Sequence, residues 1–155
     1  MRMAELAITV IMQRRSLNNP WLSEAWSAVG VVPQASAGVV SGWLSLATSA
    51  ERDTYLVPGL RLELFPDEDE GYFENAMAPE PKVFVKWRMQ EGRAIPVMAS
   101  VSYAEGTRMF DSGEAADGVP MPGDIHAWLL AYLQAHYQPR STRREHRGPK
   151  SAGPA

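Results

Sequence analysis

Residues 83–101 read VFVKWRMQEGRAIPVMASV, and this stretch decides the fold that the sequence predicts. On either side of Glu91-Gly92-Arg93, apolar side chains recur at every second position, which is the period of a half-buried strand. A glycine within a short polar break between two such runs indicates a hairpin. We therefore expect two antiparallel strands, at 83–89 and 95–101, as the best-defined pair in the chain.

The same period of two recurs toward the N-terminus. It predicts five further strands, near residues 6–13, 24–32, 42–47, 53–57 and 60–65. Turn signals rich in Asn, Pro and Gly separate several of them, at residues 17–20, 33–38 and 58–59. The chain is thus expected to contain about seven strands.

Two segments depart from the strand pattern. The acidic run at 67–70 follows Pro66 and predicts a short helix over 67–77, because carboxylates in the first turn complement the helix dipole. Nearer the C-terminus, apolar residues recur at intervals of three and four, which predicts an amphipathic helix that ends before Pro139. These residues are Ile125, Trp128, Leu129, Tyr132, Leu133 and Tyr137. The segment 103–123 is rich in Gly, Asp and Pro, and we expect it to be a long connection.

These elements predict one globular α+β domain over residues 1–138. In it, a twisted antiparallel sheet or partial barrel of about seven strands is packed by the C-terminal helix. A chain of 155 residues with 45% hydrophobic residues can bury one sizeable core. Residues 139–155 carry five basic side chains against one acidic side chain, together with several Pro and Gly, so this tail is predicted to be disordered.

Composition excludes several classes of chemistry. The chain has no Cys, so disulfides, Cys-ligated zinc, Cys-ligated iron–sulfur clusters and cysteine nucleophiles are ruled out. The acidic excess of the residues before the tail argues against a nucleic-acid-binding body. The uncharged stretch 25–50 holds too many Ser, Thr, Gly and Pro for a bilayer span, and the N-terminus lacks the order of a signal peptide. We expect a soluble, cytoplasmic protein.

Motifs for catalysis or cofactor binding are weak. His126 and His136 lie ten residues apart on the predicted helix, on directions about 80° apart, so they cannot share a metal ion. A calcium loop counted from Asp67 would need Gly and Glu at the positions that hold Tyr72 and Ala78. A set of Ser112, His126 and Asp124 can be imagined as a catalytic triad, but no local motif accompanies it. No glycine-rich phosphate-binding motif occurs, and we expect no cofactor.

Several short motifs occur in a characteristic order along most of the chain. They are Arg14-Arg15, Asn19-Pro20-Trp21, Trp26, Leu62-Glu63-Leu64, Asp67-Glu68, Asp111-Ser112-Gly113-Glu114, Val119-Pro120-Met121-Pro122, Trp128 and a basic C-terminus. In this order and spacing the chain resembles the DUF3305 family of uncharacterised proteobacterial proteins. The resemblance implies an accessory role near a molybdenum- or tungsten-dependent formate dehydrogenase, in assembly, maturation or regulation, because members are often encoded beside its genes. It supplies no catalytic residues.

The leading hypothesis is therefore a non-enzymatic accessory protein that binds a protein partner. Binding residues concentrate on loops and sheet edges, which gives a set of candidate contact residues. They are Trp21, Asp67, Glu68, Asp69, Glu70, Asp111, Ser112, Glu114 and Met121. The alternative is a small-molecule-binding protein or enzyme whose pocket lies between the sheet and the C-terminal helix. In that case Asp111, Ser112, Glu114 and His126 are the polar groups expected to converge on it.

Overall fold

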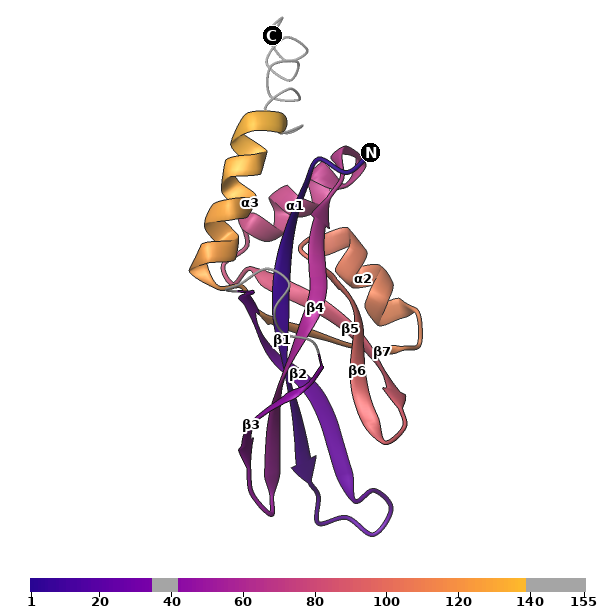
Figure 1. The fold of residues 1–155 in the computed structure, drawn as a ribbon. Coiled ribbons are helices and arrows are strands. Elements are labelled where there is room, and N and C mark those ends of the chain that lie inside the picture. The colour runs from indigo at the N-terminus through magenta and orange to yellow at the C-terminus, as the bar shows by residue number, and fades with distance from the viewer. Residues whose placement is uncertain (35–41, 139–155) are drawn as a thin grey trace, which may run out of the picture.

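Two antiparallel sheets form the framework of the computed structural model, which describes residues 1–34 and 42–138 (Figure 1). The first sheet has the strand order β2-β1-β4-β3, and the second has the order β6-β5-β7. The strands of the first sheet are β1 (Ala4–Ser16), β2 (Glu24–Pro33), β3 (Leu44–Thr48) and β4 (Arg52–Leu64). Those of the second are β5 (Lys82–Gln90), β6 (Arg93–Ser100) and β7 (Ala115–Pro120).

The helices gather around one end of the first sheet (Figure 1). A 3-10 turn (Pro66–Glu68) leads into α1 (Asp69–Ala76), and the other two are α2 (Tyr103–Asp111) and α3 (Gly123–His136). The opposite end of the first sheet extends beyond all three helices. We call this part, residues 13–26 and 43–55, the distal end.

The sequence correctly predicts the α+β class, the hairpin and both expected helices. The β5–β6 turn places Glu91 and Gly92 at φ values of 53° and 81°, which a two-residue hairpin turn of this hand requires. The strands expected at 53–57 and 60–65 are one continuous strand, β4. The reason is Gly59, whose φ of 111° accommodates a bulge between Pro58 and Leu60 where a turn was expected.

The expectation that 103–123 is a long connection is wrong, since this segment contains both α2 and β7. Ser102 begins α2, because its side chain accepts a hydrogen bond from the Glu105 N–H at 3.1 Å. Gly106 then lets the helix lie directly on the ring of Phe84 in β5. The glycine that reads as a loop residue is therefore a packing residue inside a helix.

The strands do not form one continuous sheet or a closed barrel. The two sheets nevertheless approach each other, with β2 beside β7 and β4 beside β6. Asp117 of β7 joins them, because its carboxylate accepts hydrogen bonds from the backbone N–H of Ala28 in β2, at 2.9 Å, and from the Trp87 indole in β5, at 2.8 Å. One carboxylate thus satisfies an open strand edge and a half-buried indole together.

The core lies between the sheets and beneath the helices. Ile8, Val10 and Met12 of β1 are fully buried on one face, as a period of two requires. Helix α3 buries Ile125, Leu129, Tyr132 and Leu133 and packs mainly against α1, with a smaller contact to β2. The predicted amphipathic helix is thus confirmed, but it covers another helix more than it covers the sheet.

Helix α1 contacts both sheets through two buried side chains. The amide of Asn75 donates to the carbonyl oxygens of Lys82 and Val101 at 2.7 and 2.8 Å and accepts from the Lys82 N–H at 3.0 Å. The hydroxyl of Tyr72 accepts from the backbone N–H of Phe65, beyond the end of β4, at 2.9 Å. A helix of only eight residues is therefore tied to both sheets.

Adding a methyl group at Gly106 should destabilise the fold. A Cβ there would lie 2.6–2.7 Å from three ring atoms of Phe84, which is itself buried. We expect Gly106→Ala to lower the free energy of unfolding in urea by about 1–3 kcal/mol, the usual cost of overpacking. The matched control is Gly123→Ala at the start of α3, where the new Cβ has no atom within 4 Å apart from its own residue, its chain neighbours and the backbone of its own helix. Equal stability of the two variants would contradict the observed contact of α2 with β5.

Candidate functional site

Two side chains of the acidic run at 67–70 form hydrogen bonds within the protein. Glu68 accepts hydrogen bonds from the Ser102 hydroxyl at 2.6 Å and from the Arg108 guanidinium at 2.9 Å, which links the start of α1 to α2. Asp69 accepts a hydrogen bond from the Tyr132 hydroxyl on α3 at 2.6 Å. Two of the four predicted contact residues thus hold the helices together, whereas Asp67 and Glu70 are exposed.

Burial raises the pKa of Asp69 above its ordinary value of 3.8, and the hydrogen bond from Tyr132 acts in the opposite direction. Burial also raises the pKa of Tyr132, so its hydroxyl stays protonated and continues to donate. Asp67, Asp69 and Glu70, with His136 and Tyr137, line an open hollow of about 530 Å³ at the C-terminal end of α3. The acidic run therefore works chiefly as a helix junction.

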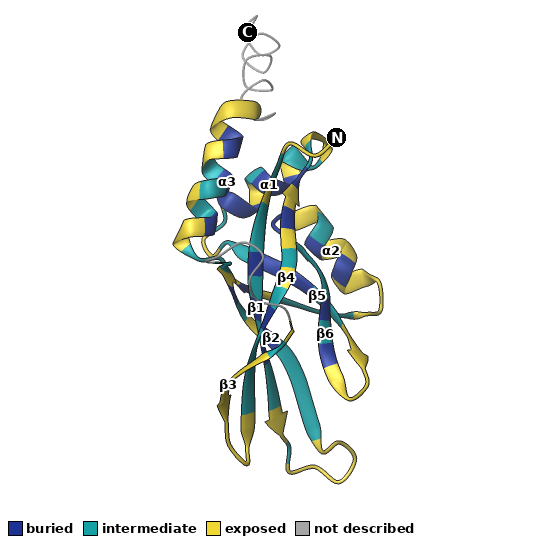
Figure 2. Ribbon diagram, viewed as in Figure 1, coloured by how far each residue is buried: buried dark blue, intermediate teal, exposed yellow. Residues whose placement is uncertain are grey.

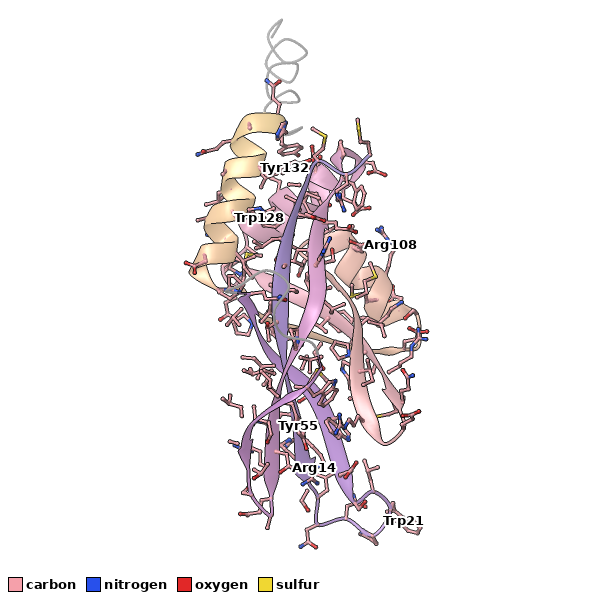
Figure 3. All side chains as sticks on the ribbon, in the orientation of Figure 1. Arg14, Trp21, Tyr55, Arg108, Trp128 and Tyr132 are labelled. Carbon is pink, nitrogen blue, oxygen red and sulfur yellow. The ribbon has the colours of Figure 1, made fainter. Side chains whose placement is uncertain are left out.

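The second predicted surface, around the end of α2, also has local structural roles. The Ser112 hydroxyl donates to the Met109 carbonyl oxygen at 2.7 Å where α2 ends. Glu114 forms an ion pair with Lys86 at 3.3 Å, and Asp111 is exposed. Met121 packs against the core between β7 and α3. Figures 1 and 3 place the end of α2 away from the β1–β2 turn that holds Trp21.

The residues expected to converge on a pocket beside the C-terminal helix do not converge. His126 approaches the Ala76 carbonyl oxygen at 3.0 Å, in the contact between α3 and α1. Asp111 and Ser112 end α2, and Figure 1 places that end of α2 on the opposite side of the molecule from α3. The set of Ser112, His126 and Asp124 is separated in the same way. Within residues 1–34 and 42–138, no group of three or more His, Asp or Glu side chains is placed to hold a metal ion.

Trp21 is held outward in the turn between β1 and β2 (Figure 3). Its side chain is 91% exposed. The turn is nevertheless ordered by two hydrogen bonds, from the Trp21 N–H to the Asn19 side chain at 2.7 Å and from the Leu17 N–H to the Ser23 carbonyl oxygen at 2.8 Å. An indole in a fixed turn is prepared for contact, because little backbone entropy is lost on binding.

Further apolar side chains are exposed at the same end of the molecule. Leu22 is 55% exposed beside Trp21, and Leu44 and Leu46 of β3 are 46% and 59% exposed. All five residues of β3 are exposed, and β3 is the edge strand of its sheet. Figure 2 shows the same contrast, with buried residues concentrated near the helices and the distal end intermediate or exposed. No sequence pattern separated Leu44 and Leu46 from core residues, since both fit an ordinary strand.

The other face of the distal end is rigidly packed. Trp26, Trp43 and Tyr55 have ring centroids 5.0–6.1 Å apart, and the Arg93 guanidinium lies 5.0 Å from the Trp43 ring centroid. Below them, Arg14 binds Asp53 at 2.7 Å, and this hydrogen bond raises the pKa of the guanidinium. These three aromatic side chains also pack against the core, so the distal end is a stiff extension of the fold.

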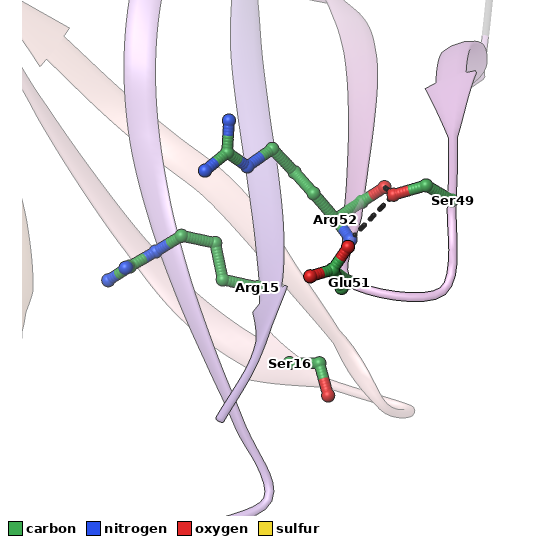
Figure 4. Close-up of a pocket in the computed structure, with 5 residues that line it drawn as sticks. All are labelled: Arg15, Ser16, Ser49, Glu51 and Arg52. Carbon is green, nitrogen blue, oxygen red and sulfur yellow. Dashed lines mark hydrogen bonds between the residues drawn. The ribbon is translucent and has the colours of Figure 1, made fainter. Parts of the chain in front are cut away.

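A polar hollow of about 460 Å³ lies at the tip of the distal end (Figure 4). It is lined by Arg15, Ser16, Ser49, Glu51 and Arg52. The Ser16 N–H donates to the Glu51 carbonyl oxygen at 2.8 Å, and the Arg52 N–H donates to the Ser49 hydroxyl at 3.0 Å. These bonds fix the β3–β4 turn against the end of β1, so the hollow has ordered walls.

Comparison with known proteins identifies a family. A family model described as "Protein of unknown function (DUF3305)" matches residues 7–146. No curated protein and no solved structure matches the chain. Within the described residues, no helix has both the length and the apolar character needed to cross a bilayer.

Replacing Asp69 should change how stability depends on pH. The raised pKa means that the folded chain binds this proton more tightly than the unfolded chain does. The resulting stability is present below the unfolded pKa and is lost as pH rises through the folded pKa. Asn cannot ionise but can still accept the Tyr132 hydrogen bond. We therefore expect the unfolding free energy of Asp69→Asn, relative to wild type, to increase as pH rises from the acid range. Urea titrations at several pH values test this, and a relative stability that falls with pH would contradict it.

Proposed function

We propose that this chain, which belongs to the DUF3305 family, is a cytoplasmic, non-enzymatic accessory protein that binds a protein partner through its distal end. The resemblance seen in the sequence directs this proposal to a molybdenum- or tungsten-dependent formate dehydrogenase. The partner is then a subunit of that enzyme or one of its maturation factors, and the role is in assembly, maturation or regulation.

The observation that carries the proposal is the exposed Trp21 in an ordered turn. Tryptophan is enriched among the residues that dominate protein interfaces, because one rigid side chain buries a large area. Removing a whole indole from water is worth on the order of 4–6 kcal/mol before the costs of association. A soluble chain that holds this group outward gains nothing for its own fold, but it gains a contact residue.

The surroundings of Trp21 support the same role. Leu22, Leu44 and Leu46 extend the apolar surface of the distal end. Single exposed apolar residues are common on protein surfaces, but several at one end of a molecule indicate an interaction site. Within residues 1–34 and 42–138, no further strand pairs with the outer side of β3, and such an edge is a common site of strand addition by a partner. The aromatic cluster on the other face keeps this surface in one shape.

Affinity capture tests the proposal. Tagged wild-type chain is recovered from its native host grown with formate, and co-purifying proteins are identified by mass spectrometry. We expect formate dehydrogenase subunits or their maturation factors with the wild type, and at least about tenfold less of them with Trp21→Ala, as truncation of a central interface residue predicts.

Two control variants keep the result specific. Phe110→Ala removes another half-exposed aromatic, from α2, and Asp111→Asn with Glu114→Gln neutralises the second surface that the sequence predicted. Both should capture as wild type does, once circular dichroism shows that they fold. Undiminished capture by Trp21→Ala, or loss of capture only in the Asp111–Glu114 variant, would contradict the assignment to the distal end.

A further inference from the structure

Two arginines face each other at the tip of the distal end. Arg15 of β1 is the direct partner of Arg52 in β4, and residues in register on neighbouring strands project from the same face. The preceding pair in the ladder, Arg14 and Asp53, projects from the opposite face and forms an ion pair at 2.7 Å. The two faces of the sheet thus differ at this point, since one pair is neutralised and the other consists of two cations.

Neither Arg15 nor Arg52 forms an ion pair with any described residue of the chain. Like charges directly opposite each other destabilise a strand pair. In Figure 4 both side chains extend toward the same side of the hollow, away from the turn that holds Ser49. The two guanidiniums and the hydroxyl of Ser16 therefore offer a concentrated set of hydrogen-bond donors, whereas the Ser49 hydroxyl donates to the Arg52 carbonyl oxygen at 3.0 Å.

We propose that the hollow between Arg15 and Arg52 binds carboxylates of an acidic, partly apolar segment of the partner protein. This inference rests on the proposed function, because the hollow lies in the distal end that also carries Trp21. Guanidinium groups bind carboxylates through paired N–H donors, which fixes orientation as well as affinity. Trp21 and Leu22, in the turn that directly follows Ser16, take the apolar side chains of the same segment.

Glu51 decides what kind of anion fits. Its side chain lines the same hollow, so the two arginines leave an excess of only one positive charge there. A nucleic acid presents a closely spaced row of phosphates and needs several cations in a row. A protein segment that alternates single carboxylates with apolar groups matches one excess charge beside an exposed indole.

The test uses a display library of random peptides, selected on the immobilised full-length chain. We expect the enriched peptides to carry Asp or Glu next to apolar residues. Their affinity should fall about tenfold with Arg15→Gln/Arg52→Gln, because two charge-assisted contacts are lost, and added salt should weaken binding to the wild type more than to this variant. The matched control is Arg61→Gln/Arg88→Gln, which removes two exposed arginines outside the distal end and should bind within about twofold of wild type.

The outcomes separate this inference from the function on which it rests. One outcome is that enriched peptides lose affinity for Trp21→Ala and yet bind Arg15→Gln/Arg52→Gln as tightly as they bind the control Arg61→Gln/Arg88→Gln. That result would overturn the acidic-segment inference and leave protein binding through the distal end intact. Selection of no peptide, or of peptides indifferent to Trp21→Ala and to both arginine variants, would overturn both. If single-stranded RNA binds in a manner that depends on Arg15 and Arg52, and no acidic peptides are enriched, the acidic-segment inference is overturned in favour of a phosphate ligand.

Discussion

The buried amide of Asn75 is the interaction on which the arrangement of the fold depends. It is fully buried, and its three hydrogen bonds hold α1 at the start of β5 and just beyond the end of β6. Leaving such groups unpaired in the core would cost about 1–3 kcal/mol each, so the helix has one favourable position on the second sheet. Tyr72, one turn earlier, fixes the same helix to the end of β4 in the first sheet. Through these two residues, the sheets and the helices share one core.

Concentrating the core at one end leaves the other end free for recognition. The strands β1 and β4 are each 13 residues long, and only part of that length lies beneath the helices and the second sheet. The distal end is stiffened locally, by the Trp26–Trp43–Tyr55 cluster and by the pair Arg14–Asp53. A rigid, partly apolar extension with an outward tryptophan and an arginine pair that leaves one excess positive charge is the physical basis of the proposed protein-binding role.

Local patterns predicted most of the elements, and long-range contacts account for what they missed. Alternation revealed the hairpin and β1, because each strand buries one face. Two glycines were misinterpreted. Gly59 was assigned to a turn but forms a bulge, and Gly106 was assigned to a connection but allows a helix to pack on Phe84; both roles depend on residues distant in sequence. For the site, the sequence singled out Trp21 because it flanks a turn, and its role as a contact residue stays a prediction.

The roles of Glu68 and Asp69 in joining helices depend on Ser102, Arg108 and Tyr132, which are distant in sequence. The Arg15–Arg52 pair likewise required the register of β1 with β4.

Hydrogen–deuterium exchange on the complex with the captured partner tests the central claim most directly, because it maps the contact without altering any residue. Binding through the distal end predicts slower exchange in the turn 17–23, in β3 and in the turn 49–51, with exchange in α1, α2 and α3 unchanged. Protection confined to the helices, or to the segment 111–121, with the distal end exchanging as in the free chain, would contradict the account.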